Sequence, residues 1–265
     1  MENNKIAIFL DIDGTLYDSK IKAIPLSTLH ILEELEKDGM YDLYIATGRS
    51  HNTLGPISAI KSKFKGFVLA NGQNVIIDNK TIYEGSLNYQ DVNDFVSFCN
   101  DNTLSIVLLT SDGLYYNHFN PKSKDNFENY IKAKVDPLNN RKFKLGDIIQ
   151  EIWLFAGNDV IEPLKDQFPK FKIINWGSYG ADIIPCNISK GKGVLKVIEY
   201  MGYSLDHTYC IGDGDNDVDM FKEVGTSICM ENGSPKAKSA ATFIGFNVSD
   251  DGLMKNIQTY IMNKK

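Results

Sequence analysis

Cysteine pairs and histidine clusters are missing from this sequence. Four cysteines occur in 265 residues, and no two of them form a Cys-x-x-Cys pair. The four histidines are scattered without the spacing of metal ligands. These absences argue against a zinc site. Each cysteine lies in or beside an apolar segment, so we expect buried free thiols, which suit a reducing cytoplasm.

Long apolar runs and a surplus of basic residues are also missing. No apolar run reaches the roughly 18 residues that a membrane span requires. Residues 1–5 lead directly into a predicted strand and do not have the form of a signal peptide. The formal net charge of −6 disfavours a surface for nucleic acid or for anionic membranes. We therefore expect a cytoplasmic protein without a nucleic-acid or membrane partner.

The sequence does have an ordinary globular composition and a repeating order of strands and helices. Hydrophobic residues make up 43% and charged residues 23% of the chain, and its length allows one or two domains. Five apolar residues, Ile6 to Leu10, predict a buried strand. Alternating helices and strands follow to about residue 83, which is typical of a parallel α/β sheet.

The pattern changes in the middle third of the chain and returns afterwards. From residue 84 to residue 186, helical segments mix with strands that resemble hairpins. We therefore predict a Rossmann-like parallel sheet core with helices on both faces, built from residues 1–83 and 187–265. An α+β cap domain is inserted between them at residues 84–186. The predicted helices include residues 25–38, 51–64 with an early interruption at Pro56, 89–102, 125–135 and 193–201.

Two aspartates follow the first strand at positions i and i+2, namely Asp11 and Asp13. Side chains along an extended chain alternate between its two sides, so positions i and i+2 would place both carboxylates on the same side. Like charges about 4 Å apart repel by roughly 4 kcal/mol at an effective dielectric constant near 20. Either a cation balances them or one of them is protonated. Oxygen ligands of this kind suit Mg²⁺, although a plain polar turn would have the same short pattern.

Four polar clusters share one placement, at the end of a predicted strand or at the start of a helix. In open parallel sheets, ligands bind outside the carboxyl ends of the strands, so such a sheet would bring these clusters together. Each cluster alone has an ordinary alternative, such as a strand-to-helix turn or a solvated helix start. The clusters are Asp11/Asp13, Thr47-Gly48-Arg49, Ser189-Lys190-Gly191, and Asp213 through Asp217.

These motifs together resemble those of the haloacid dehalogenase-like phosphatases, and more closely the Cof-type group with a large inserted C2-type cap. The resemblance covers nearly the whole chain. It is carried by Asp11-Ile12-Asp13-Gly14-Thr15-Leu16, Ala46-Thr47-Gly48-Arg49, Ser189-Lys190-Gly191 and Gly212-Asp213-Gly214-Asp215-Asn216-Asp217.

The resemblance implies a role for each acid. Asp11 would be the nucleophile that forms an aspartyl-phosphate. Asp13 would protonate the leaving oxygen and later take a proton from the attacking water. Mg²⁺ would be held by the Asp11 side chain, the Asp13 backbone carbonyl and Asp213. Asp217 would not bind the metal itself but would orient Lys190 next to the metal ligands.

The resemblance also implies how the phosphate is held. The Thr47 hydroxyl and the Gly48 amide would bind phosphate oxygens. Lys190 would neutralise charge on Asp11 and on the transferred group, and Asn216 would help to bind phosphate and to order the water around the metal. Arg49 is a candidate substrate contact, with an ion pair to a surface acid as its alternative.

The expected function is a Mg²⁺-dependent phosphatase for small phosphorylated metabolites of the sugar phosphate, pyridoxal phosphate or flavin mononucleotide type, acting as a monomer or weak homodimer. A phosphomutase or phosphotransferase with the same chemistry and a non-catalytic phosphate-binding module are the alternatives. The module would have lost a catalytic residue, and none is lost. One departure from many Cof-type members is Glu231, which adds a negative charge near the rim of the site.

Overall fold

The computed structural model describes residues 5–110, 113–117, 144–176 and 179–264, together with residues 123, 125 and 127. The chain divides into two compact units. Unit 1 comprises residues 1–49, 56–83 and 189–265, and unit 2 comprises residues 50–55 and 84–188. The predicted boundaries lay at 83/84 and 186/187, and the role of the inserted segment as a cap stays a prediction. The helix predicted at 125–135 falls almost entirely outside the described residues.

Unit 1 contains a sheet whose eight described strands have the order β13-β12-β11-β1-β2-β3-β4-β5. The strands from β13 to β3 are parallel, and β4 runs antiparallel to β3. The central strand β1 lies between β11 and β2, so its carboxyl end opens at the middle of the sheet edge. The strands are β1 (Ile6–Leu10), β2 (Tyr41–Ala46), β3 (Gly66–Leu69), β4 (Asn74–Ile77), β5 (Lys80–Glu84), β11 (Thr208–Gly212), β12 (Thr226–Cys229) and β13 (Phe243–Ile244).

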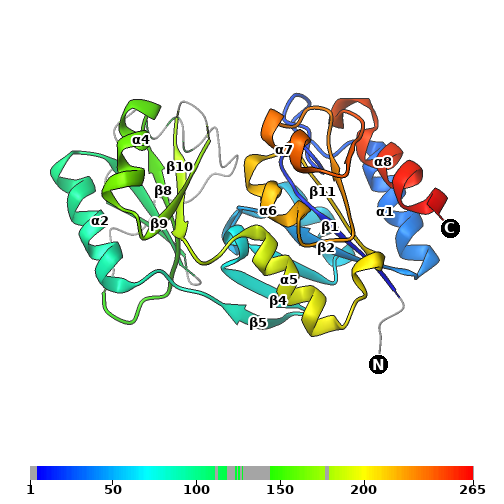
Figure 1. Ribbon diagram of the computed structural model, residues 1–265, viewed down its shortest axis with the longest axis horizontal. Helices are drawn as coiled ribbons and strands as arrows, with labels where there is room; N and C mark the ends of the chain where they lie inside the picture. Colours follow the sequence, from blue (N-terminus) through cyan, green and yellow to red (C-terminus); the bar gives the residue numbers. More distant parts are fainter. Residues whose placement is uncertain are drawn as a thin grey trace. The chain divides into compact units, whose positions relative to one another are not determined.

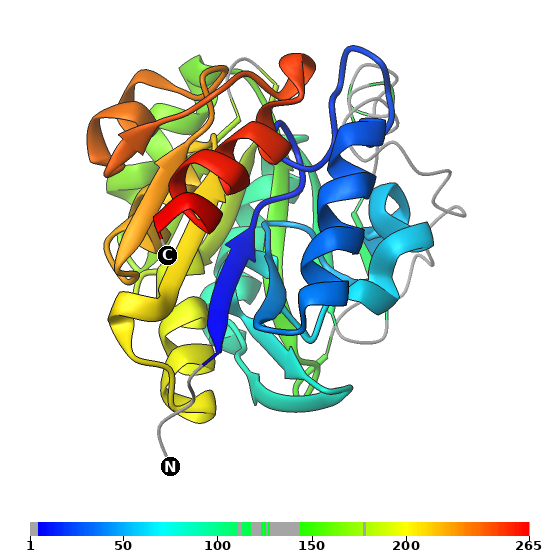
Figure 2. The ribbon, with the colours of Figure 1, turned by 90° about the vertical axis from the view of Figure 1, so that its right-hand side faces the viewer.

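Helices cover both faces of this sheet, as predicted. Figure 1 shows α1 and α8 on one face and α5 and α6 on the other, and Figure 2 shows α1 beside the α8 end of the chain. On the α5 face, Phe9 of β1 packs in one core cluster with Val194 and Val197. The helices are α1 (Leu26–Asp38), α5 (Lys190–Met201), α6 (Val218–Phe221), α7 (Pro235–Ala240) and α8 (Gly252–Tyr260).

Two segments differ from the helices that periodicity predicts, one in its type of helix and the other in the residue where it begins. The helix predicted at 51–64 consists of two 3₁₀ segments, His51–Thr53 and Gly55–Lys63. Pro56 lies in this stretch, and proline lacks the N–H that a continuing α-helix would use. The helix predicted at 193–201 begins three residues earlier, because the Ser189 hydroxyl caps it by accepting the N–H of Lys192 at 3.2 Å.

A chain of hydrogen bonds, buried except at its Lys5 end, ties the residue before β1, strand β2 and the turn after α5 together. The Tyr203 hydroxyl donates to Asp42 Oδ2 at 2.6 Å and lies 2.7 Å from the Tyr44 hydroxyl. Since the Tyr203 proton is used on Asp42, the Tyr44 hydroxyl is the donor in that second bond. Lys5 Nζ donates to the other oxygen of Asp42 at 3.1 Å. Burial raises the pKa of both tyrosines, so both hydroxyls keep their protons.

The Tyr203→Phe substitution is expected to lower the free energy of unfolding by about 1.5 to 3 kcal/mol, because a buried carboxylate loses a donor. The Tyr260→Phe substitution is the control, since the Tyr260 hydroxyl makes a 3.3 Å bond in an exposed position. We expect the control to change stability by less than about 0.5 kcal/mol. Urea unfolding measures both, and equal effects in the two variants would contradict the role of the buried chain.

Unit 2 contains an antiparallel sheet of five described strands in the order β7-β6-β8-β10-β9. One core cluster joins this sheet to α2 through Phe95 and to α4 through Leu164. This is the α+β arrangement that the sequence predicts. The elements are α2 (Tyr89–Asp101), β6 (Ser105–Thr110), β7 (Leu114–Tyr116), β8 (Ile149–Phe155), α4 (Asn158–Gln167), β9 (Phe171–Asn175) and β10 (Ala181–Pro185).

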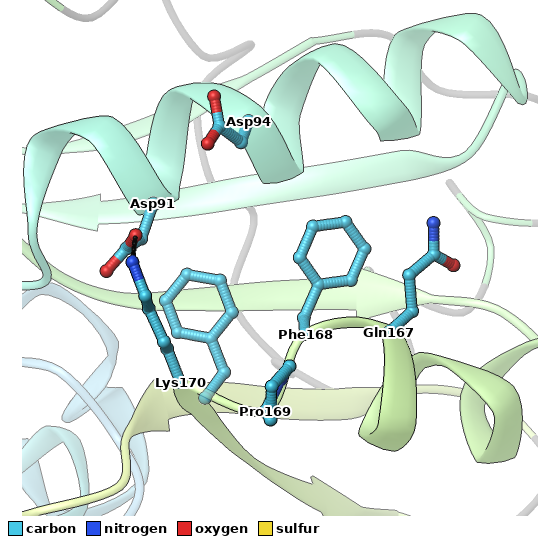
Figure 3. Close-up of a pocket in the computed structure, with 7 residues that line it drawn as sticks. Asp91, Asp94, Gln167, Phe168, Pro169 and Lys170 are labelled. Carbon is cyan, nitrogen blue, oxygen red and sulfur yellow. Dashed lines mark hydrogen bonds and ion pairs between the residues drawn. The ribbon is translucent and has the colours of Figure 1, made fainter.

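A small pocket of about 230 Å³ lies in unit 2 between α2 and the turn that joins α4 to β9. Figure 3 shows the Phe168 ring in it and the Lys170 side chain reaching Asp91. The Lys170–Asp91 ion pair measures 2.6 Å and is exposed. None of the predicted catalytic residues lines this pocket. In the described part of the chain, no helix combines the length and the apolar character that crossing a membrane requires.

Candidate active site

Asp11 begins the loop that leaves the carboxyl end of β1. Its backbone N–H still bonds the carbonyl of Ile211 in β11 at 3.0 Å, and its side chain is buried. The chain turns immediately afterwards, with Gly14 at a φ of +81°. A Cβ on Gly14 would lie 2.1 Å from Asp213 Oδ2, so only glycine fits there. Gly14 therefore allows the loop after β1 to pack against Asp213.

Lys190 connects Asp11 to Asp217 across long distances in the sequence. Its Nζ atom lies 2.8 Å from Asp11 Oδ1 and 2.6 Å from Asp217 Oδ1. The lysine and Asp217 are fully buried, and Asp11 is nearly so. Burial alone would lower the pKa of Lys190, but the two carboxylates outweigh it and raise that pKa. The side chain therefore stays a cation between two anions.

Asp213 and Asp217 follow β11 in a short loop. Asp217 Oδ2 accepts the backbone N–H groups of Asp213 at 2.9 Å and of Gly214 at 2.8 Å. Because its other oxygen contacts Lys190, Asp217 uses both carboxylate oxygens within the protein. Ligand oxygens of Asp11, Asp213 and Asp217 lie within 4.8 Å of one another. The loop thus places a third acid, Asp213, next to the Lys190 ion pairs.

The acid cluster fits a hard divalent cation. The cluster contains three carboxylates and one ammonium group, which forms ion pairs with two of them. Burial raises the pKa of Asp11, against the opposing effect of Lys190 and with a smaller contribution from the neighbouring carboxylates. Burial and then the neighbouring carboxylates raise the pKa of Asp213. These shifts mean that the two charged forms lack a full counter-charge. Mg²⁺ prefers oxygen ligands of this kind, and Asp11 and Asp213 would hold it because Asp217 is already occupied. The predicted contribution of the Asp13 carbonyl stays a prediction.

The Thr47-Gly48-Arg49 turn follows β2 on the neighbouring strand. The Thr47 hydroxyl oxygen accepts the N–H of Arg49 at 3.1 Å and is buried, so its own proton is available for donation to another group. The Arg49 guanidinium pairs with Asp13 through two bonds, Nε to Oδ2 at 2.6 Å and Nη2 to Oδ1 at 2.8 Å. Asp11 and Asp13 therefore have different cationic partners, Lys190 and Arg49.

Asn71, which was not predicted as a site residue from the sequence, links two of the predicted motifs. Its Oδ1 accepts a hydrogen bond from Asn216 Nδ2 at 3.1 Å. A Cβ on Gly48 would lie 3.2 Å from the Asn71 amide nitrogen. Ala70, Asn71 and Gly72 all have positive φ values, between 47° and 97°. Non-glycine residues in this region cluster at functional sites. The Asn-Gly pair after a predicted strand was the available signal, and it indicated only a turn.

Asn232, next to the unusual Glu231, is a second site residue that was not predicted from the sequence. Its Nδ2 donates to the Gly14 carbonyl at 2.9 Å and to Asp213 Oδ2 at 3.2 Å. Its Oδ1 accepts the N–H of Val248 at 2.9 Å. One amide therefore joins the loop after β1, the loop after β11 and the segment before α8. Asn232 orients one oxygen of Asp213 and leaves the other for a ligand.

The predicted residues thus form three connected groups in unit 1. Asp11, Lys190, Asp213 and Asp217 make the charged centre. Asp13 pairs with Arg49, and Asn216 meets Asn71 beside Gly48. Such an arrangement offers a buried carboxylate paired with a cation, and the turn after the neighbouring strand β2 carries the Thr47 hydroxyl as a donor. It can accept an electrophilic, negatively charged group such as a phosphoryl group.

Comparison with known proteins agrees with this geometry. The family model described as haloacid dehalogenase-like hydrolase matches residues 8–257. A Bacillus subtilis protein named "Putative phosphatase YkrA" is 32% identical over 247 residues, covering 93% of this chain and 94% of that protein. The pyridoxal phosphate phosphatase YbhA of Escherichia coli is 25% identical over 260 residues, with coverage of 92% and 94%.

Among solved structures, the sugar phosphatase BT4131, described as a subclass IIB member, superposes with a TM-score of 0.87. It is 23% identical, and the match covers 97% of this chain and 99% of that one. At this identity the likeness concerns the fold, and it extends over both units.

Proposed function

This chain belongs to the haloacid dehalogenase-like hydrolase family and is a phosphatase, and from that premise we propose that it hydrolyses small phosphorylated metabolites through an aspartyl-phosphate on Asp11. One observation carries the proposal. Lys190 bridges buried Asp11 and Asp217, with Asp213 in the same cluster. A phosphoryl group needs a positioned nucleophile and neutralised charge, and this cluster supports both.

Both steps of the proposed reaction can be assigned to residues of this chain. In the first step an Asp11 oxygen bonds to phosphorus, the ester P–O bond breaks, and the Asp13 carboxyl gives its proton to the leaving oxygen. In the second step Asp13 takes a proton from water, whose oxygen bonds to phosphorus as the P–O bond to Asp11 breaks, which releases phosphate and restores the Asp11 carboxylate. Thr47 and the Gly48 amide would hold phosphate oxygens, and Lys190 would balance the charge of Asp11 during both steps.

Mg²⁺ is the cation that we propose for the acid cluster. When bound, it would supply positive charge beside the nucleophile and the transferred group. Asp11 and Asp213 would hold it, while Asn216 and Asp217 keep the surrounding side chains in place. The raised pKa of both Asp11 and Asp213 supports this assignment, because each acid gains from a nearby cation.

The substrate class is proposed from the relatives and from the inserted unit. The named relatives include a phosphatase for pyridoxal phosphate, and a structural neighbour is a sugar phosphatase. We propose a substrate of similar size, with unit 2 acting as the cap that contacts the part of the substrate beyond the phosphate. The proposed residues of the chemical step all lie in unit 1.

Phosphate release from a panel of sugar phosphates, pyridoxal phosphate and flavin mononucleotide tests the proposal. We expect turnover of at least one member with Mg²⁺ and a loss of about 100-fold or more with EDTA in its place. Transfer of the phosphoryl group to an added sugar instead of water would favour the phosphotransferase alternative. The absence of phosphate release from every member with Mg²⁺ present would contradict this substrate class.

A further inference from the structure

We propose that Arg49 is a positioning residue, whose guanidinium holds the Asp13 carboxyl where it exchanges a proton with the leaving oxygen. The inference rests on the proposed function of Asp13 and assigns Arg49 a role different from a direct substrate contact. The observation behind it is the pair of bonds from Nε to Oδ2 at 2.6 Å and from Nη2 to Oδ1 at 2.8 Å.

The two bonds fix more than the distance between the charges. Parallel N–H···O bonds from one edge of a guanidinium hold a carboxylate in one plane, which a single contact does not. The exposed fractions of the two side chains differ, with 9% for Arg49 and 47% for Asp13. A half-exposed aspartate on a turn would otherwise sample several rotamers. The buried arginine therefore acts as the fixed support and the aspartate as the held group.

Arg49 is itself anchored at its backbone. Its N–H bonds Thr47 Oγ1 at 3.1 Å, and its carbonyl accepts the N–H of Ala70 at 3.0 Å. These bonds tie it to the turn proposed to bind phosphate. The same residue thus sets the position of Asp13 relative to Thr47 and Gly48. A proton donor must keep a fixed distance from the bound phosphate ester, and misplacement by about 1 Å can cost about 100-fold in rate.

If Arg49 contacted the substrate directly, its guanidinium would have to bind the substrate and not Asp13. The Nε and Nη2 atoms form the edge best suited to a bidentate anion, and Asp13 occupies both. To clamp a substrate phosphate with this edge, Arg49 would have to leave Asp13. The structure thus separates two hypotheses that predict different kinetics.

The test compares substrates whose leaving groups differ in their need for a proton. An alkyl phosphate needs protonation of its leaving oxygen, whereas p-nitrophenyl phosphate releases a stable phenolate. For Arg49→Met, we expect kcat to fall by about 100-fold on the alkyl phosphate and by less than about 5-fold on p-nitrophenyl phosphate. The KM values should change little. The Arg49→Lys variant keeps the charge but lacks the fork, and we expect an intermediate loss with the same dependence on leaving group.

Three further variants complete the design. Asp13→Asn should show the same dependence on leaving group, and the double variant Arg49→Met/Asp13→Asn should lose no more than Asp13→Asn alone, because the two residues act as one unit. Lys236→Gln is the charge control, since Lys236 is exposed and its ion pair with Asp215 is a long one of 3.9 Å. It should leave both rates unchanged. Thermal unfolding of each variant checks that it is folded.

The outcomes separate the hypotheses. Equal losses on both substrates together with a raised KM would show that Arg49 binds substrate, and the proposal would be wrong. Additive losses in the double variant would also contradict it. If Asp13→Asn itself shows no dependence on the leaving group, the proposed acid role of Asp13 fails, and the role of Arg49 fails with it. Should Arg49→Met not fold, the Arg49→Lys series decides by the same comparison.

Discussion

Replacing Asp11 by asparagine is expected to lower phosphate release by about 10⁴-fold or more, the scale of loss that follows removal of a nucleophile. Asparagine has the same shape but no carboxylate oxygen to attack phosphorus. The fold should remain, because Lys190 keeps its 2.6 Å contact with Asp217. Burial raises the pKa of Asp11, so the charged form is costly there and its loss should change stability by less than about 2 kcal/mol.

Trapping the covalent intermediate makes this expectation specific. After acid quench of a reaction with radiolabelled substrate, wild-type protein should carry label, and Asp11→Asn should carry none. Asp13→Asn should still carry label with p-nitrophenyl phosphate, because its first step does not need the proton. Asp250→Asn is the control at an exposed acid and should behave as wild type. A covalent label on Asp11→Asn, or activity above about one tenth of wild type, would contradict the nucleophile assignment.

The convergence of Lys190 on Asp11 could be predicted from the sequence, although 179 positions separate them. The strand that ends at Leu10 and the helix that follows Ser189 both open at the carboxyl edge of a parallel sheet, and that edge gathers ligands. The rule depends only on the order of strands and helices. Hydrophobic periodicity and strand order therefore predicted the fold class and the meeting of the polar clusters, whereas the pairing of Lys190 with Asp11 was implied by the family resemblance.

The partners of Arg49, Asn71 and Asn232 could not be predicted in this way. Each depends on where one side chain points after a turn, and turn residues follow no period. Asn71 has a left-handed φ of 50°, which a sequence does not reveal for a non-glycine residue. Arg49 had two plausible partners, and only the structure pairs it with Asp13. Local backbone geometry thus supplied the links that the motif positions left open.

Lys190→Met is expected to produce the largest loss of stability, about 3 to 5 kcal/mol in the absence of divalent cations. The substitution removes the ammonium that lies 2.8 Å from Asp11 and 2.6 Å from Asp217, and it leaves two buried carboxylates without that counter-charge. Methionine keeps much of the volume, so packing changes little. Activity should fall by about 100-fold or more, because the charge on Asp11 and on the transferred group is no longer balanced.

The pH dependence of this deficit has a definite sign. Burial raises the pKa of Asp11, and removing Lys190 removes the charge that opposes this increase. The native variant then binds more protons than the unfolded chain, so its free energy of unfolding falls as pH rises. We expect the stability deficit relative to wild type to be larger at pH 8 than at pH 6. Urea unfolding at both values, without divalent cations, measures it.

A double variant separates stability from catalysis at this position. In Lys190→Met/Asp217→Asn one of the two uncompensated charges is gone, while the asparagine oxygen can still accept the N–H groups of Asp213 and Gly214 that now bond Asp217. We expect it to recover at least half of the lost stability and none of the lost activity. Recovery of activity along with stability would mean that Lys190 serves only to hold the fold. Recovery of neither would mean that repulsion between buried carboxylates is not the cause of the instability.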